Sequence, residues 1–177
     1  IEQADALLIV GANPRLEAAV LNARIRKRWR MDNFPIGVIG EQGELRYGYD
    51  YLGAGTDTLS GLLDGSVKFA AKLKKAERPM IIVGQGALSR PDGLAVLSAV
   101  SALAEKVGAV KAGWNGLAVL HTAASRVGGL DLGFVPGEGG KTAAEMLTGT
   151  DVLFLLGADE MDFSQKTAFT VYIGSHG

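Results

Sequence analysis

Short, uninterrupted apolar runs, each followed by a turn, constrain the fold of this chain more than any other feature of its sequence. The clearest runs lie at residues 6–10, 36–40, 80–83, 152–156 and 169–173. Runs of this length without polar alternation are typical of strands buried on both faces of a parallel sheet, and helical patterns fall between them. The sequence therefore predicts a doubly wound, mostly parallel α/β sheet with helices on both faces. We expect residues 1–177 to form a single α/β domain, excised from a longer chain and incomplete at both ends.

The first strand-to-helix unit is the best defined. Gly11 and Ala12 follow the first run, and then Asn13 suits a helix N-cap and Pro14 the first helical position. We expect a helix over residues 15–29. Its predicted inner stripe is Leu16, Val20, Ala23 and Ile25. The cations of its last turns, which complement the helix dipole, are Arg24, Arg26, Lys27, Arg28 and Arg30. A solvated basic face is the simpler interpretation of this run, and contact with an acidic partner is the alternative.

The rest of the chain gives weaker signals. Tyr47, Tyr49 and Tyr51 alternate with other residues, which predicts an extended ribbon whose rings pack on the domain or, alternatively, face a partner. We expect helices over residues 67–75, 92–107 and 141–147, a short strand over 109–111 and an extended loop over 128–140.

One segment is echoed within the chain. Residues 5–13 match residues 151–159 in residue type, so that Gly11-Ala12-Asn13 corresponds to Gly157-Ala158-Asp159. Both turns follow buried-strand patterns, and strands of a parallel sheet share one direction, so we expect both turns at one carboxyl edge. Ligands of open α/β sheets bind at that edge. We also expect free N–H groups and Arg15 near this crevice, an arrangement that favours an anion.

Composition and motifs exclude several functions. The chain has no cysteine, which excludes thiolate zinc sites, cysteine-ligated clusters and disulfides, and its net charge of −1 gives no general attraction to nucleic acid. No apolar run is long enough to span a membrane. The segment 84–89 has Ser89 in place of the third glycine of a dinucleotide fingerprint, and the segment 139–142 lacks the first glycine of a phosphate-binding loop.

The remaining candidates are isolated. His121 and His176 lie far apart and outside any zinc-protease spacing. Asp159, Glu160 and Asp162 form an acidic group after a strand, for which surface acids are the simpler interpretation and a magnesium or sugar-hydroxyl contact the alternative. The residues by themselves therefore predict a fold and a crevice, without a reaction.

Residues 4–27 closely resemble the large iron–sulfur subunit (75-kDa type) of respiratory NADH:quinone oxidoreductase, complex I. The joint occurrence of Asn13-Pro14-Arg15 and the run from Val20 to Lys27 is the specific part. The resemblance continues through residues 79–84, 130–133, 152–159 and 171–177. Ala19 stands where relatives commonly have proline.

The resemblance implies a molybdopterin oxidoreductase-like domain that has lost its cofactor, with the iron–sulfur clusters of the parent subunit elsewhere in that subunit. The pterin-contacting positions of the wider family map onto Gly11, Asn13, Pro14, Gly157 and Asp159, which would be a vestigial crevice. It further implies peripheral-arm subunits of complex I as partners, without nucleic acid or direct membrane insertion. The implied location is the cytoplasmic side of the bacterial inner membrane, or the matrix side in mitochondria.

Two other classes stay open on the sequence. Residues 78–84 and the following helix also resemble the central domain of thiamine-diphosphate enzymes. A free-standing nucleotide-binding module is the third possibility. We expect the purified fragment to be free of iron, molybdenum and zinc and to oxidise no NADH.

Overall fold

The first part of the chain forms a five-stranded parallel sheet in a computed structural model that describes residues 1–123, 125–158 and 161–175. Its strands are β1 (Ala6–Val10), β2 (Ile36–Ile39), β3 (Asp50–Gly53), β4 (Pro79–Gly84) and β7 (Leu117–Leu120). They lie in the order β3-β2-β1-β4-β7, and each neighbouring pair is parallel. The chain winds outward from β1 to β3 and then returns to the other side of β1, so the order reverses between β1 and β4. The expected mostly parallel α/β fold is confirmed.

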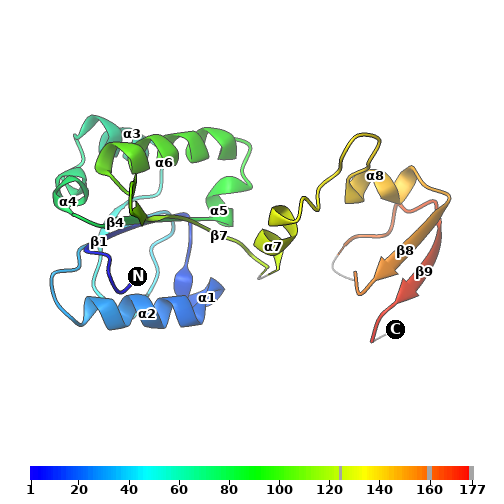
Figure 1. The fold of residues 1–177 in the computed structure, drawn as a ribbon, viewed down its shortest axis with the longest axis horizontal. Coiled ribbons are helices and arrows are strands. Elements are labelled where there is room, and N and C mark those ends of the chain that lie inside the picture. The colour runs from blue at the N-terminus through cyan, green and yellow to red at the C-terminus, as the bar shows by residue number, and fades with distance from the viewer. Residues whose placement is uncertain (124, 159–160, 176–177) are drawn as a thin grey trace. The chain divides into compact units, whose positions relative to one another are not determined.

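Strand β1 lies at the centre of this sheet and is covered on both faces. Alternate side chains of β1 belong to two different hydrophobic clusters, and every one of them is at most 2% exposed. One face packs against α3 (Asp57–Asp64), α4 (Phe69–Lys75) and α6 (Gly93–Val107), and α1 (Pro14–Glu17) and α2 (Ala19–Trp29) lie on the other side (Figure 1). This double burial explains why the run lacks polar alternation.

The helix expected over residues 15–29 is interrupted. Ala18 has φ −151° and ψ 70°, which ends α1 at Glu17 and starts α2 at Ala19. The predicted inner stripe is therefore wrong for most of its members: Leu16 is 81% and Val20 78% exposed, and only Ile25 is fully buried. The break changes the rotational register, so that Asn22 and Ile25 face the sheet instead.

Several elements differ from the sequence expectations. Strand β5 (Val110–Lys111) pairs antiparallel with β6 (Trp114–Asn115) and lies outside the parallel sheet, whose edge is formed by β7. Helix α3 lies in a segment for which no element was predicted, and α5 (Gln85–Leu88) is a short helix directly after β4. Of the three tyrosines, Tyr47 is buried and Tyr49 packs against the same cluster, in agreement with the packing interpretation, whereas Tyr51 is 42% exposed and does not belong to that cluster.

The described residues form two compact units, Ile1–Ala124 and Ser125–Gly177. The second contains α7 (Arg126–Asp131), α8 (Ala143–Thr148) and the parallel pair β8 (Val152–Leu156) and β9 (Phe169–Ile173). Because β1 and β8 belong to different sheets, the prediction of one sheet edge carrying both turns is wrong. An apolar run indicates that a strand is covered on both faces, but it does not indicate which other strands pair with it. In β8, Phe154 is 59% and Leu156 73% exposed.

Candidate functional site

A crevice of about 480 Å³ opens at the carboxyl ends of the parallel strands of the first unit. It lies where the strand order reverses, which is the usual ligand position in open α/β sheets. Its walls come from the segments that follow β1, β2, β3 and β4. The lining residues include Gly11, Asn13, Glu17, Gly40, Glu41, Thr56, Ala87 and Arg90.

Glycines allow the turns after β1 and β4 to touch. Gly11 has φ +56°, and a Cβ on it would lie 2.4 Å from the Cβ of Ala87. A Cβ on Gly84 would lie 2.4 Å from the carbonyl oxygen of Gly11. The Gly11 N–H donates to the carbonyl of Ile39 at 2.8 Å, which extends the sheet pairing into the turn. The floor of the crevice is therefore closed by backbone-to-backbone packing.

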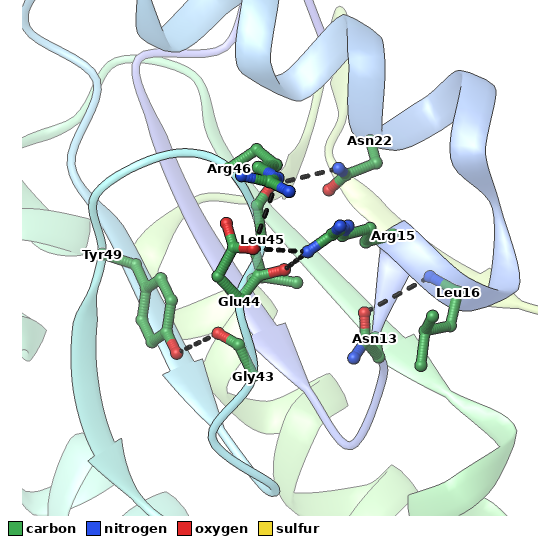
Figure 2. Close-up of polar contacts among 9 residues, drawn as sticks. All are labelled: Asn13, Arg15, Leu16, Asn22, Gly43, Glu44, Leu45, Arg46 and Tyr49. Carbon is green, nitrogen blue, oxygen red and sulfur yellow. Dashed lines mark hydrogen bonds and ion pairs between the residues drawn. The ribbon is translucent and has the colours of Figure 1, made fainter.

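Asn13 and Pro14 start α1 as the sequence predicts. The Asn13 side chain accepts a hydrogen bond from the N–H of Leu16 at 3.4 Å (Figure 2). Pro14 occupies the first turn of α1. The carboxylate of Glu17, one turn later, accepts the N–H of Asn13 at 2.5 Å. Glu17 was not among the residues predicted for this site. An acid four residues after a capping asparagine is the one sequence signal that would have identified it.

The charges around the crevice do not favour an anion. Glu17 already occupies the Asn13 N–H, and Glu41 adds a second carboxylate to the lining. Arg90 is the one cation among the described lining residues, and its guanidinium bonds the Asp92 carboxylate at 2.8 and 3.1 Å, which lowers the pKa of Asp92.

Arg15, expected near the crevice, instead binds the loop after β2. Its Nη1 donates to the Glu44 carboxylate at 2.7 Å and to the Glu44 carbonyl at 2.9 Å (Figure 2). The pyrophosphate of a pterin dinucleotide requires N–H donors and cations that are not otherwise engaged. The Asn13 N–H, Arg15 and Arg90 do not fit that requirement, because each already has a carboxylate partner.

The internal echo is reproduced in backbone geometry. Gly157 has φ +59°, and its N–H donates to the carbonyl of Ile173 at 2.8 Å, just as Gly11 donates to the end of its neighbouring strand. The two segments therefore end their strands with the same turn, although on different sheets. Asp159 and Glu160 lie outside the described residues, as does His176.

The other motifs have local structural roles. The segment 84–89 forms the tight turn into α5, and the N–H of Ser89 donates to the carbonyl of Gln85 at 2.8 Å. Thr142 caps α8 in a capping box with Glu145, so the segment 139–142 ends in a helix cap. Among the described residues, no group of three or more His, Cys, Asp or Glu side chains is placed to hold a metal ion. No helix in the same ranges is long and apolar enough to cross a membrane.

The doubly wound parallel sheet with a crevice at its switch point defines an open α/β domain. The chain belongs to the molybdopterin oxidoreductase family, whose model matches residues 1–177.

Within that family the chain is similar to large subunits of NADH:quinone oxidoreductases. It is 38% identical over 179 residues to an iron–sulfur protein 1 of mitochondrial NADH dehydrogenase from Solanum tuberosum. It is 41% identical over 178 residues to a subunit of the NADH-quinone oxidoreductase of Rickettsia bellii. It is 43% identical over 180 residues to the mitochondrial 78 kDa subunit of NADH-ubiquinone oxidoreductase from Candida albicans. These matches cover 100% of this chain and 24–25% of the relatives, and they confirm the resemblance to the complex I subunit.

Proposed function

We propose that this chain is a cofactor-free structural domain in the cluster-carrying subunit of a proton-pumping NADH:quinone oxidoreductase. The observation that carries the proposal is the match of the whole chain to such subunits, at 38–43% identity. The chain supports electron transfer by stabilising the subunit, whose iron–sulfur clusters lie in other segments. Its partners are the other subunits of the peripheral arm, and its place is the cytoplasmic or matrix side of the membrane.

The geometry of the crevice supports the absence of a pterin role. Glu17 acts as an internal anion on the Asn13 N–H, at the position where the wider family contacts its cofactor. We propose that Gly11, Asn13, Pro14, Gly157 and Asp159 are a vestigial form of that contact set. In the first unit, Gly11, Asn13 and Pro14 now fix the turn between β1 and α1. We further propose that residues 1–177 belong to one α/β domain of the parent subunit.

The decisive experiment uses the full-length parent subunit in its native complex. Asn13→Ala, which removes the α1 cap, should lower the amount of assembled complex. The cluster signals in electron paramagnetic resonance and the NADH oxidation, each per assembled complex, should stay unchanged. A loss of either quantity at a normal amount of complex would show that the crevice takes part in electron transfer.

A binding measurement distinguishes the other two classes. Isothermal titration of the chain with ATP, NAD⁺ and pyrophosphate should give no binding at millimolar concentrations, because the Asn13 N–H and the Arg90 guanidinium are already engaged. Micromolar binding of a nucleotide would favour a nucleotide-binding module or the thiamine-enzyme domain.

A further inference from the structure

A basic groove lies along the side of α2 that borders the loop at residues 43–46. The groove has a volume of about 730 Å³ and lies away from the crevice, between α2 and the loop at residues 43–46. Its α2 wall is formed by Ala19, Ala23, Arg26, Lys27 and Arg30, whose spacing places them on one side of the helix. Asn22 fixes the opposite wall, because its Nδ2 donates to the carbonyl of Leu45 at 3.1 Å (Figure 2).

The cations of this region divide into two sets. Arg15 and Arg46 bind Glu44, Arg24 binds Glu2, and Arg28 donates to the Ala4 carbonyl. Arg26, Lys27 and Arg30 are exposed, and none of them has an ion-pair partner in the described part of the chain. Helix α2 itself contains no acidic residue. The positive charge of the groove is therefore not neutralised by the fold.

Apolar side chains lie beside these cations. Val20 is 78% exposed and stands seven residues before Lys27, on the same side of α2, and Met31, which lines the groove, is 58% exposed. A purely solvated basic helix has no reason to present large aliphatic groups next to its charges. Interfaces between proteins combine an apolar centre with a charged rim in this way.

We propose that this groove, defined by Ala19, Ala23, Arg26, Lys27 and Arg30, binds an acidic amphipathic segment of another subunit of the complex. Carboxylates of that segment pair with Arg26, Lys27 and Arg30, and one of its apolar side chains packs on Val20 and Ala23. The assignment of this acidic segment to another subunit of the complex rests on the proposed function. The aliphatic groups favour a protein over a nucleic acid, for which stacking aromatic side chains are the usual complement.

The test is photo-cross-linking in the native complex with the full-length subunit. Benzoylphenylalanine replaces Ala23 in one sample. In the control sample it replaces Leu94, an aliphatic residue of α6 that is 79% exposed. The Ala23 probe should link to a segment of another subunit in which Asp and Glu outnumber Lys and Arg. The Leu94 probe should not link to that segment. An Ala23 probe that gives no adduct, or links only to its own subunit, a lipid, a nucleic acid or a segment without excess acid, overturns the proposal.

Charge reversal tests the role of the cations. The triple variant Arg26→Glu, Lys27→Glu, Arg30→Glu should lower the yield of the Ala23 adduct by about tenfold, because attraction becomes repulsion. The matched variant Lys68→Glu, Lys74→Glu, Lys75→Glu changes the charge equally on exposed residues near α4 and should leave the yield within about twofold. Equal losses in both variants would contradict a specific groove.

Failure of the proposed function would look different. In that case the wild-type subunit would purify without an NADH-oxidising complex. The Ala23 adduct would still show whether an acidic protein segment occupies the groove. An acidic adduct from another assembly would thus contradict the proposed function but support a basic docking surface on α2. A normal NADH-oxidising complex without an adduct would support the proposed function but contradict the docking surface.

Discussion

Gly11 carries two separate constraints, one on its backbone and one on the space around it. Its φ of +56° disfavours any side chain, and the Cβ of Ala87 occupies the space that a side chain would need. Gly113 has only the first constraint, since its φ is +76° and a Cβ there would meet nothing within 4 Å. The pair therefore separates backbone strain from close packing.

We expect Gly11→Ala to lower the free energy of unfolding of the first unit by about 2–4 kcal/mol, the sum of backbone strain and overpacking. Gly113→Ala should cost about 1–2 kcal/mol from strain alone. Urea denaturation followed by circular dichroism measures both. Equal losses of unfolding free energy in the two variants would show that the turn after β1 can move away from α5.

Tyr47 has a buried hydroxyl without a hydrogen-bond partner among the described residues. Burial raises the pKa of this phenol, so it stays neutral at ordinary pH. Removing an unsatisfied buried group relieves its desolvation cost, so Tyr47→Phe should raise the free energy of unfolding by about 1 kcal/mol. Tyr49→Phe is the control, because the Tyr49 hydroxyl donates to the Gly43 carbonyl at 2.6 Å and its loss should cost about 1 kcal/mol. Destabilisation by both variants would indicate a hydrogen bond of Tyr47 that the structure lacks.

Residue patterns predicted the turn after β1 that lines the crevice. They did not predict that the Glu17 carboxylate binds the Asn13 N–H in this turn. Gly11, Asn13 and Pro14 have intrinsic preferences for their positions, and these preferences are visible in the sequence. The bond from Asn13 to Glu17 depends on the path of the chain through the turn. The contact between Gly11 and Ala87 joins segments distant in sequence, which local preferences do not encode.

At the level of elements, the strands of the core were predictable and the break at Ala18 was not. Strands β1, β2 and β4 are apolar because both of their faces are covered, so their sequences reveal them. Alanine favours a helix, so residues 14–29 of this chain do not themselves mark Ala18 as the point of interruption. The proline that relatives commonly have at position 19 is the one hint, because a residue before proline avoids helical backbone. Strand β7 is only half-buried at the sheet edge and was missed.

Helix α2 is tied to the N-terminal segment by an ion pair that depends on pH. Hydrogen bonds from Arg24, at 2.7 and 2.8 Å, lower the pKa of Glu2 from its ordinary 4.5 to about 2. A carboxyl with a lowered pKa in the folded state stabilises the fold above its ordinary pKa, and this contribution is lost as the pH falls from about 4.5 to about 2. The pair is exposed, so the effect is small and is screened by salt.

We expect Glu2→Gln to lower the urea midpoint slightly at about pH 6, with the difference from wild type vanishing near pH 2. Arg24→Gln should show the same pH dependence, and the double variant should add nothing further. A difference that persists at pH 2 or in about 1 M salt would assign the effect to something other than this ion pair.

For the whole molecule, the two units differ in their capacity to fold alone. The first has a central strand covered on both faces and two hydrophobic clusters. The second has a two-stranded parallel sheet whose large apolar side chains are mostly exposed. Parallel sheets depend on cover from both sides, and two-stranded sheets are marginal on their own.

Residues 1–124 expressed alone should therefore unfold in one cooperative urea transition. Residues 125–177 alone should show little amide-exchange protection, because few buried contacts stabilise their strands. Protected amides in β8 and β9 of the isolated segment would show that the pair needs no additional cover.

The position of β1 also has a consequence during synthesis. The ribosome makes β1 before the other four strands of its sheet, and β1 lies in the middle of that sheet, where it pairs with β2 and with β4. From Val10 to Gly84 the ribosome adds the residues that complete this pairing, which takes roughly 4–15 s at about 5–20 residues per second. For that interval the most apolar strand of the first unit lacks its second neighbour. We therefore expect chaperones that act at the ribosome to bind the segment Ala6–Val10 of the nascent chain during that interval.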